Sequence, residues 1–174
     1  TNYTGGSFGG RGGARNGGVS SNLTYGDFTE PLELGSGGAS TGNYGGSGGG
    51  AVYLEASRLV LDGKIQANGA QVDSNRAGGS GGSIYLKVDE FAFAESAGSL
   101  ESNGANINNY GGGGGGRIAV YYTSGSYDFS KAIASGGSST YIASDMGGVG
   151  TVYIEQLNKA PILNFNNRGN TGPI

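Results

Sequence analysis

Residues 48–55 read Gly-Gly-Gly-Ala-Val-Tyr-Leu-Glu, a glycine run followed by a strand-like alternation of apolar side chains. The arrangement returns as Gly-Gly-Ser-Ile-Tyr-Leu-Lys at 81–87, Gly-Gly-Arg-Ile-Ala-Val-Tyr at 115–121 and Gly-Val-Gly-Thr-Val-Tyr-Ile-Glu at 148–155. The first apolar residues of the four copies are 32, 34 and 34 residues apart: Val52, Ile84, Ile118 and Val152. A fixed period in this range is typical of stacked-repeat architectures.

A second set of apolar residues repeats with the same period. Ile65, Leu100 and Ile133 lie later in each repeat and are 35 and 33 residues apart. One short strand cannot bury its apolar side, whereas equivalent strands stacked in parallel about 4.8 Å apart form continuous ladders. The sequence therefore predicts an all-β fold, a parallel β-solenoid of about 3–4 rungs with a period of about 32–35 residues.

The glycine content divides the chain into three segments within one domain. We expect residues 1–50 to form a glycine-rich N-terminal cap and packing segment, 51–156 the solenoid repeats, and 157–174 a C-terminal extension. The glycine runs recur in register with the strands, which a flexible linker has no reason to do. They predict stacked, polyglycine-like segments whose backbones approach too closely for a Cβ.

Composition excludes several classes of function. The net charge is −3 and the arginines are scattered singly, which argues against a nucleic-acid partner. The chain has no cysteine, so it has neither disulfides nor thiolate metal ligands. No apolar run approaches the ~20 residues of a membrane helix, so we expect no membrane insertion. We also expect no cofactor.

Catalysis is not expected either, since the chain contains no histidine to act as the usual base. Asp27, Glu30 and Glu33 lie close together around a proline and could in principle supply paired glycosidase carboxylates. Acids in such a loop are more often simply solvated. Ice binding ranks last, because the sequence lacks a regular threonine ladder.

Two kinds of surface site are suggested by the residues. Tyr53, Tyr85 and Tyr153 occupy the positions between the inward apolar residues, so they form an outward ladder or lie under a second layer. If exposed, they suit contacts with glycans or partner proteins. The sequons Asn2-Tyr3-Thr4 and Asn22-Leu23-Thr24 make Asn2 and Asn22 candidates for glycosylation.

The C-terminal extension carries apolar residues beyond the last repeat, namely Ile162, Leu163 and Phe165. It is either a linker to a further domain or a strand that pairs with another copy of the chain. Ends of stacked structures are natural head-to-tail interfaces, and a contact of that kind grows a filament.

The order of the motifs also resembles a known class of proteins. Residues 25–35 read Tyr-Gly-Asp-Phe-Thr-Glu-Pro-Leu-Glu-Leu-Gly, and two repeats turn at Asn-Gly-Ala, residues 68–70 and 103–105. Over roughly residues 5–156 the chain resembles the glycine-rich β-repeat regions of large secreted or cell-surface structural and adhesin-like proteins. Phe8 stands where those regions often carry histidine, so the resemblance supplies no metal or catalytic residue there.

The resemblance implies an extracellular or cell-surface location and a structural or adhesive role. Together with the repeats, it predicts a non-catalytic module that serves as a subunit or spacer of a surface fibre, filament or adhesive stalk. Its expected partners are other copies, neighbouring domains of a longer chain, and glycans. The alternative is a carbohydrate-binding or polysaccharide-processing β-helix, suggested by the tyrosine ladder and the acidic cluster.

Overall fold

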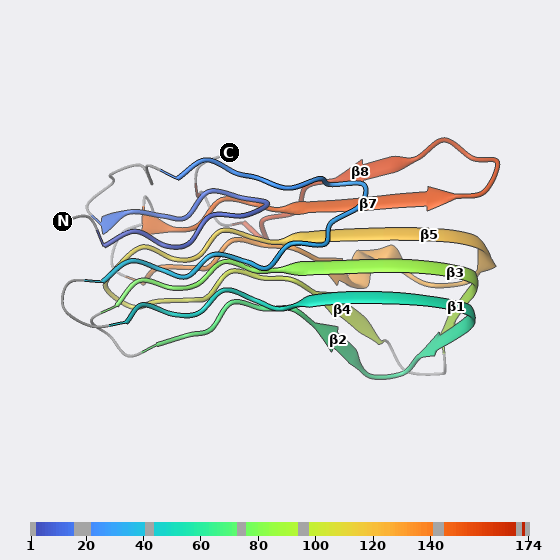
Figure 1. Ribbon diagram of the computed structural model, residues 1–174, viewed down its shortest axis with the longest axis horizontal. Helices are drawn as coiled ribbons and strands as arrows, with labels where there is room; N and C mark the ends of the chain where they lie inside the picture. The colour runs from blue at the N-terminus through green and yellow to red at the C-terminus, as the bar shows by residue number, and fades with distance from the viewer. Residues whose placement is uncertain are drawn as a thin grey trace.

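The computed structural model describes residues 3–15, 22–40, 44–72, 76–93, 98–140, 145–169 and 172. These residues form eight strands and a short 3-10 helix: β1 (Ala51–Leu61), β2 (Lys64–Gln66), β3 (Ser83–Phe93), β4 (Ser99–Glu101), β5 (Arg117–Gly125), η2 (Phe129–Lys131), β6 (Ala132–Ile133), β7 (Thr151–Gln156) and β8 (Ile162–Asn164). In Figure 1 the labelled elements occupy one half of the molecule, and extended segments without strand arrows run side by side through the other half.

The strands form two sheets with a hydrophobic core between them. The larger sheet has the order β1-β3-β5-β7-β8 and the smaller one β2-β4-β6. β1, β3, β5 and β7 are parallel neighbours, whereas β8 pairs antiparallel with β7. Completely buried side chains from both sheets fill the space between them: Ile84, Leu86, Phe91, Leu100, Ile118 and Val120.

The prediction of a parallel β-solenoid is wrong. The larger sheet is mixed, because the chain turns back after β7 and adds β8 in the opposite direction. The smaller sheet is parallel but consists of strands of only two or three residues. The glycine-rich part of each repeat belongs to neither sheet, so the repeats do not form complete β-coils.

The apolar ladders of the larger sheet have the register that the sequence predicts. Val52 pairs with Ile84, Ile84 with Ile118, and Ile118 with Val152. In the smaller sheet the predicted pairing of Ile65 with Leu100 is confirmed. The next step is wrong by one residue, since Leu100 pairs with Ala132 and Ile133 lies opposite Glu101. The helical turn η2, which comes directly before β6, shifts this pairing relative to the simple repeat.

The glycine-rich half is a bundle of extended segments. Three successive amides donate to three different segments: Gly113 N–H to the Ala105 carbonyl at 3.1 Å, Gly114 to Gly6 at 2.9 Å, and Gly115 to Gly148 at 2.9 Å. Neighbours in three directions are what a helix of three residues per turn requires, as in the polyproline II conformation. A sheet strand has neighbours in two directions only, which is why these segments lie outside both sheets.

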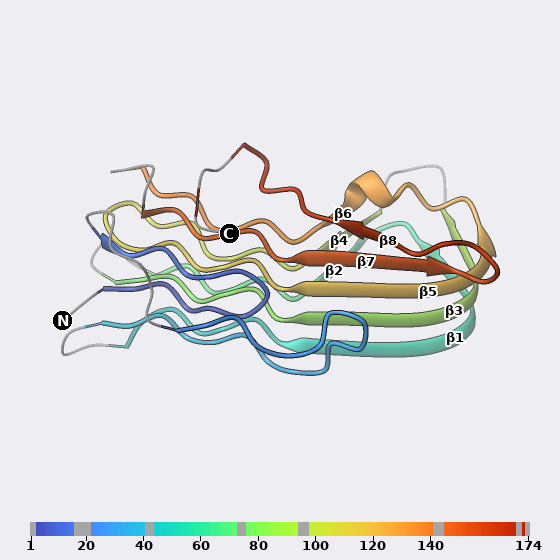
Figure 2. The ribbon, with the colours of Figure 1, turned by 90° about the horizontal axis from the view of Figure 1, so that it is seen from above.

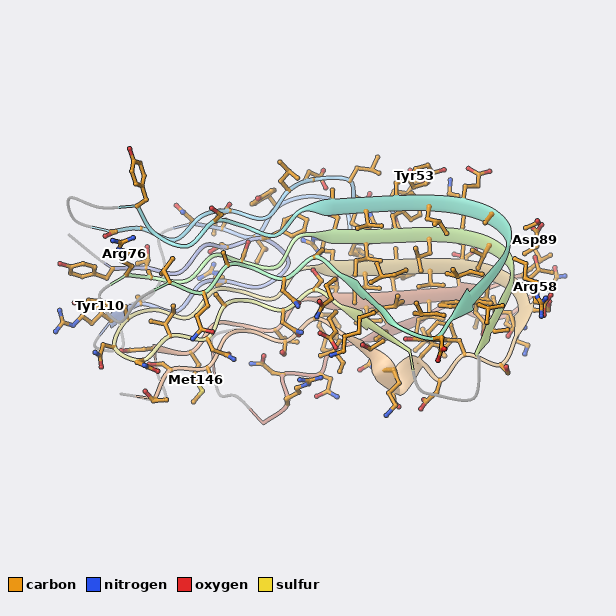
Figure 3. All side chains as sticks on the ribbon, turned by 90° about the horizontal axis from the view of Figure 1, so that it is seen from below. Tyr53, Arg58, Arg76, Asp89, Tyr110 and Met146 are labelled. Carbon is orange, nitrogen blue, oxygen red and sulfur yellow. The ribbon has the colours of Figure 1, made fainter. Side chains whose placement is uncertain are left out.

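The bundle needs glycine because its backbones touch. A Cβ on Gly113 would overlap the carbonyl oxygen of Gly79, and a Cβ on Gly104 or Gly147 would overlap that of Gly113. None of these glycines has a positive φ, so close approach rather than backbone conformation selects glycine here. Figure 3 shows the contrast, with side chains crowded in the strand half and sparse in the glycine half, where Arg76 and Tyr110 mark the far end.

The first 50 residues contribute to the same bundle. Gly5 donates to Gly13 at 2.8 Å, and Gly10 donates to Gly115 at 2.8 Å, so residues 5–13 fold back on themselves and join the third repeat. Gly49 donates to Ser80 at 2.8 Å and links residues 45–50 to the second repeat. Early and late glycine runs therefore share one hydrogen-bonded layer.

Asparagines link the repeats at one corner. Asn103 N–H donates to the Asn68 Oδ1 at 2.7 Å, and Ser135 N–H donates to the Asn103 Oδ1 at 3.0 Å. Each side-chain oxygen thus satisfies a backbone donor of the next repeat, which fixes the stacking distance at the turn.

A carboxylate ties the first two strands of the smaller sheet together. Glu101 accepts hydrogen bonds from Lys64 Nζ at 3.0 Å, Gln66 Nε2 at 2.7 Å and Ser99 Oγ at 2.8 Å. Burial by itself raises the pKa of Glu101, but the three donors outweigh it and lower the pKa to about 2.

Candidate functional site

The outer face of the larger sheet gathers most of the sequence-predicted site residues. Side chains alternate across a strand, so the residues between the buried ladder positions point away from the core. Tyr53, Tyr85, Ala119 and Tyr153 are aligned neighbours across four strands on this face. Figure 3 shows Tyr53 projecting from β1 on the side away from β2.

The tyrosines form a continuous aromatic row. The ring centroids of Tyr53 and Tyr85 are 5.2 Å apart, those of Tyr85 and Tyr121 are 5.8 Å apart, and those of Tyr121 and Tyr153 are also 5.8 Å apart. Tyr121 comes from the next outward position of β5 and fills the gap that Ala119 leaves. The ladder predicted from three tyrosines therefore depends on a fourth, which the sequence analysis missed.

The row is only partly open to solvent. Tyr53 is 51% exposed, whereas Tyr85 is 3% exposed and Tyr153 is half-buried. The cover is the segment 25–34, which Figure 2 shows in blue beside the first halves of the parallel strands. Tyr121 donates to the Thr29 carbonyl at 3.2 Å, and the Phe28 ring lies 5.8 Å from that of Tyr153. Tyr85 thus lies under a second layer, while Tyr53 remains available for contacts.

Arg117 anchors this covering segment. It stands where the neighbouring strands have Ser83 and Thr151, and it is 7% exposed. Its Nε and Nη2 donate to the Tyr25 carbonyl at 3.0 and 2.8 Å, and its Nη1 donates to Thr151 Oγ1 at 3.2 Å. Burial lowers the pKa of Arg117. An arginine at a register position that is otherwise Ser or Thr was the available sequence signal for this anchor.

The three acids of the covering segment have separate structural partners. Asp27 Oδ1 accepts from the Thr29 hydroxyl at 2.6 Å and the Thr29 N–H at 2.7 Å, and these bonds lower the pKa of Asp27. Glu30 Oε1 accepts from the Tyr85 hydroxyl at 3.2 Å, and Glu33 Oε2 from the Leu32 N–H at 3.2 Å. Each acid holds the segment's own conformation or its contact with the sheet, which is a structural use of the carboxylates.

Two tyrosine–glutamate pairs repeat on the first and fourth strands. The Tyr53 hydroxyl donates to Glu55 Oε2 at 2.6 Å, and the Tyr153 hydroxyl donates to Glu155 Oε2 at 2.6 Å. The hydrogen bond to Glu155 is the main cause that raises the pKa of Tyr153 to about 12. The spacing of two residues in each pair places ring and carboxylate on the same face of the strand.

A shallow groove of about 430 Å³ lies on the same face, beyond the covering segment. It is lined by residues 55–57, 87–89 and 121–123 together with Glu155 and Leu157. Glu55, Lys87, Tyr121 and Glu155 form one aligned row across its floor. Carboxylates, an amine and aromatic hydroxyls in an open groove of this size can hydrogen-bond a polar ligand and pack against its apolar faces.

The other predicted residues lie elsewhere. Asn22 is exposed. Asn2 lies outside the described residues. Ile162 and Leu163 are on β8, and Phe165 follows it; all three side chains are exposed, at 60%, 41% and 57%.

Comparisons of the chain with protein-family models, curated proteins and solved structures found no match. Within the described ranges, no helix has the length and apolar character needed to cross a membrane. The same part of the chain contains no group of three or more histidine, cysteine, aspartate or glutamate residues arranged to hold a metal ion.

Proposed function

We propose that this chain is a non-catalytic structural module of an extracellular assembly, a spacer or subunit of a surface fibre or adhesive stalk. The observation that carries the proposal is the glycine bundle. Its segments come from every repeat and from the first 50 residues, and their amides are hydrogen-bonded across segments rather than to solvent. A chain that spends much of its length on a close-packed backbone layer is built for stiffness.

The bundle and the sheets reinforce each other mechanically. Each parallel strand begins where a glycine segment ends, so that Gly116 leads into β5 and accepts from Thr151 N–H at 3.1 Å. The same stacking distance therefore runs through bundle and sheet, and a load on one half is carried by hydrogen bonds in both. This suits a part that must keep its shape between other parts.

An extracellular setting is supported by the chemistry of the surface. Asn22 and Thr24 of the second sequon are both exposed, so the acceptor amide can be reached by a glycosylating enzyme. The absence of cysteine from the sequence makes the fold independent of the redox state of its surroundings.

Immunogold electron microscopy tests this proposal directly. An antibody raised against the purified chain is expected to label fibrous or coat material outside the source cells. Labelling confined to the cell interior overturns the proposal. Pre-absorbing the antibody with the purified chain is the control for specificity.

A second candidate function is carbohydrate binding, favoured by the groove beside the tyrosine row. Its aligned floor of Glu55, Lys87, Tyr121 and Glu155 offers hydrogen-bond donors and acceptors next to an aromatic ring. Sugars present the same combination, with hydroxyls at the edge and C–H groups on the face of the ring.

A glycan array with one matched pair of variants tests the second candidate. If the groove binds sugar, Tyr121→Ala is expected to weaken binding at least about fivefold, since an aromatic contact contributes about 1 kcal/mol beyond its buried area. Tyr44→Ala is the control, because Tyr44 is 91% exposed and does not line the groove. No signal on the array, or equal loss in both variants, removes the candidate.

A further inference from the structure

The two ends of the larger sheet are not equivalent. At the β7 end, Val152 and Ile154 are only 3% and 5% exposed, and β8 pairs with the outer edge of β7. At the β1 end, Val52, Leu54 and Leu59 are half-buried, although their partners on β3 are completely buried. One end of the core is therefore covered, and the other is open along an edge strand of 11 residues.

Protection of this edge is incomplete. Edge strands in soluble proteins are usually short, bulged, charged or covered, because their free backbone groups can pair with another strand. β1 carries the charged residues Glu55 and Arg58, but it also exposes Val60 by 45%. β8, at the opposite edge, carries no charge and exposes both of its apolar side chains.

We propose that the β1 edge of one copy pairs with the β8 edge of the next copy, so that the chain assembles head to tail. The proposal rests on the proposed structural function and names its partner as a second copy of this chain. Figure 1 shows β1 and β8 at opposite edges of the same sheet, which is the arrangement that a repeating head-to-tail contact requires.

Strand direction permits this contact without any rotation of the copies. β8 runs antiparallel to β7, and β7 is parallel to β1 through β5 and β3. A copy translated along the stack therefore presents its β1 antiparallel to β8. The junction would repeat the pairing that already joins β7 to β8, and the sheet would continue with its usual strand spacing.

The side chains on the two edges are also complementary by face. Ile162 lies opposite Ile154 and so belongs to the inner face, whereas Leu163 lies opposite Tyr153 and belongs to the outer face. In the proposed junction Ile162 meets the half-buried Val52 and Leu54, and Leu163 meets the exposed Tyr53. Both contacts are apolar cross-strand pairs of the kind that stabilise sheets.

Sedimentation velocity over a concentration series, with negative-stain electron microscopy of the same samples, tests the junction. The wild-type chain is expected to form a ladder of oligomers that lengthen with concentration. Leu54→Lys and Ile162→Lys are each expected to raise the dissociation constant at least about tenfold, because each buries a charge in the junction. Leu34→Lys is the matched control, since Leu34 is 64% exposed and lies on neither edge.

Mixing the two edge variants distinguishes this junction from other contacts. Leu54→Lys chains retain the β8 edge and Ile162→Lys chains retain the β1 edge, so an equimolar mixture is expected to form 1:1 dimers that do not extend. Assembly that either single variant leaves unchanged overturns the junction, as does a wild-type chain that stays monomeric throughout. In both cases extracellular labelling of the source cells still supports the structural function, so the two failures are separable.

Discussion

Gly113→Ala is expected to lower the free energy of unfolding by at least about 3 kcal/mol, because the added methyl group must displace backbone rather than a side chain. The Cβ would overlap the Gly79 carbonyl and come within 3.0 Å of the Ala105 nitrogen. Gly113 also donates to Ala105, and its own carbonyl accepts from Gly137 at 2.7 Å. Separating these segments to admit a methyl group breaks hydrogen bonds in more than one direction.

Gly50→Ala is the matched control, since Gly50 also ends a glycine run but has no atom within 4 Å of the position of its Cβ. Its φ is not positive, so alanine is expected to be neutral or to stabilise the fold by about 0.5 kcal/mol through the unfolded state. Urea unfolding followed by circular dichroism and tyrosine fluorescence measures both variants. Equal stabilities for the two would show that the glycine runs are linkers and not a packed bundle.

The glycine bundle was the part of the fold that the sequence predicted best. A run that recurs in register with strands has to be packed, and the carbonyl contacts of Gly113 show why no other residue fits. The ladder beginning at Val52 was equally accessible, because identical spacing in parallel strands leads to identical register. Both features follow from periodicity, which a sequence displays directly.

Features that break the period could not be predicted in the same way. The direction of β8 is set by the turn after Gln156, and no repeat precedes it to serve as a template. The solenoid prediction extended the parallel rule to the whole chain and failed at this strand. The one-residue shift at β6 has a similar origin, since η2 occurs in the third repeat alone among those that the structure describes.

The candidate site was predicted only in outline. The tyrosine positions placed the row on the outer face, but the depth of Tyr85 depends on where the segment 25–34 settles. Arg117 decides that placement through the Tyr25 carbonyl, a contact between residues 92 positions apart. Long-range contacts of single residues leave no periodic trace, although an arginine in a Ser/Thr register position was a visible anomaly.

The open end of the core gives the second large prediction, which compares leucines at paired positions. Leu86 is completely buried and pairs with the half-buried Leu54. Leu86→Ala is expected to lower the free energy of unfolding by about 3–5 kcal/mol, since it removes buried methyl groups and leaves a cavity. Leu54→Ala is expected to lower it by about 1–2 kcal/mol, because solvent already reaches the side chain and relaxes into the space.

The difference between the two variants is a measure of how open the β1 end is. Urea titrations on dilute samples give the values for the single chain, and repeating them where the chain associates adds the junction. Under the second condition Leu54→Ala should become costlier while Leu86→Ala keeps its cost, since only Leu54 gains contacts from a neighbouring β8. A cost for Leu54→Ala as large as that of Leu86→Ala in dilute solution would instead mean that this end of the core is already closed within one chain.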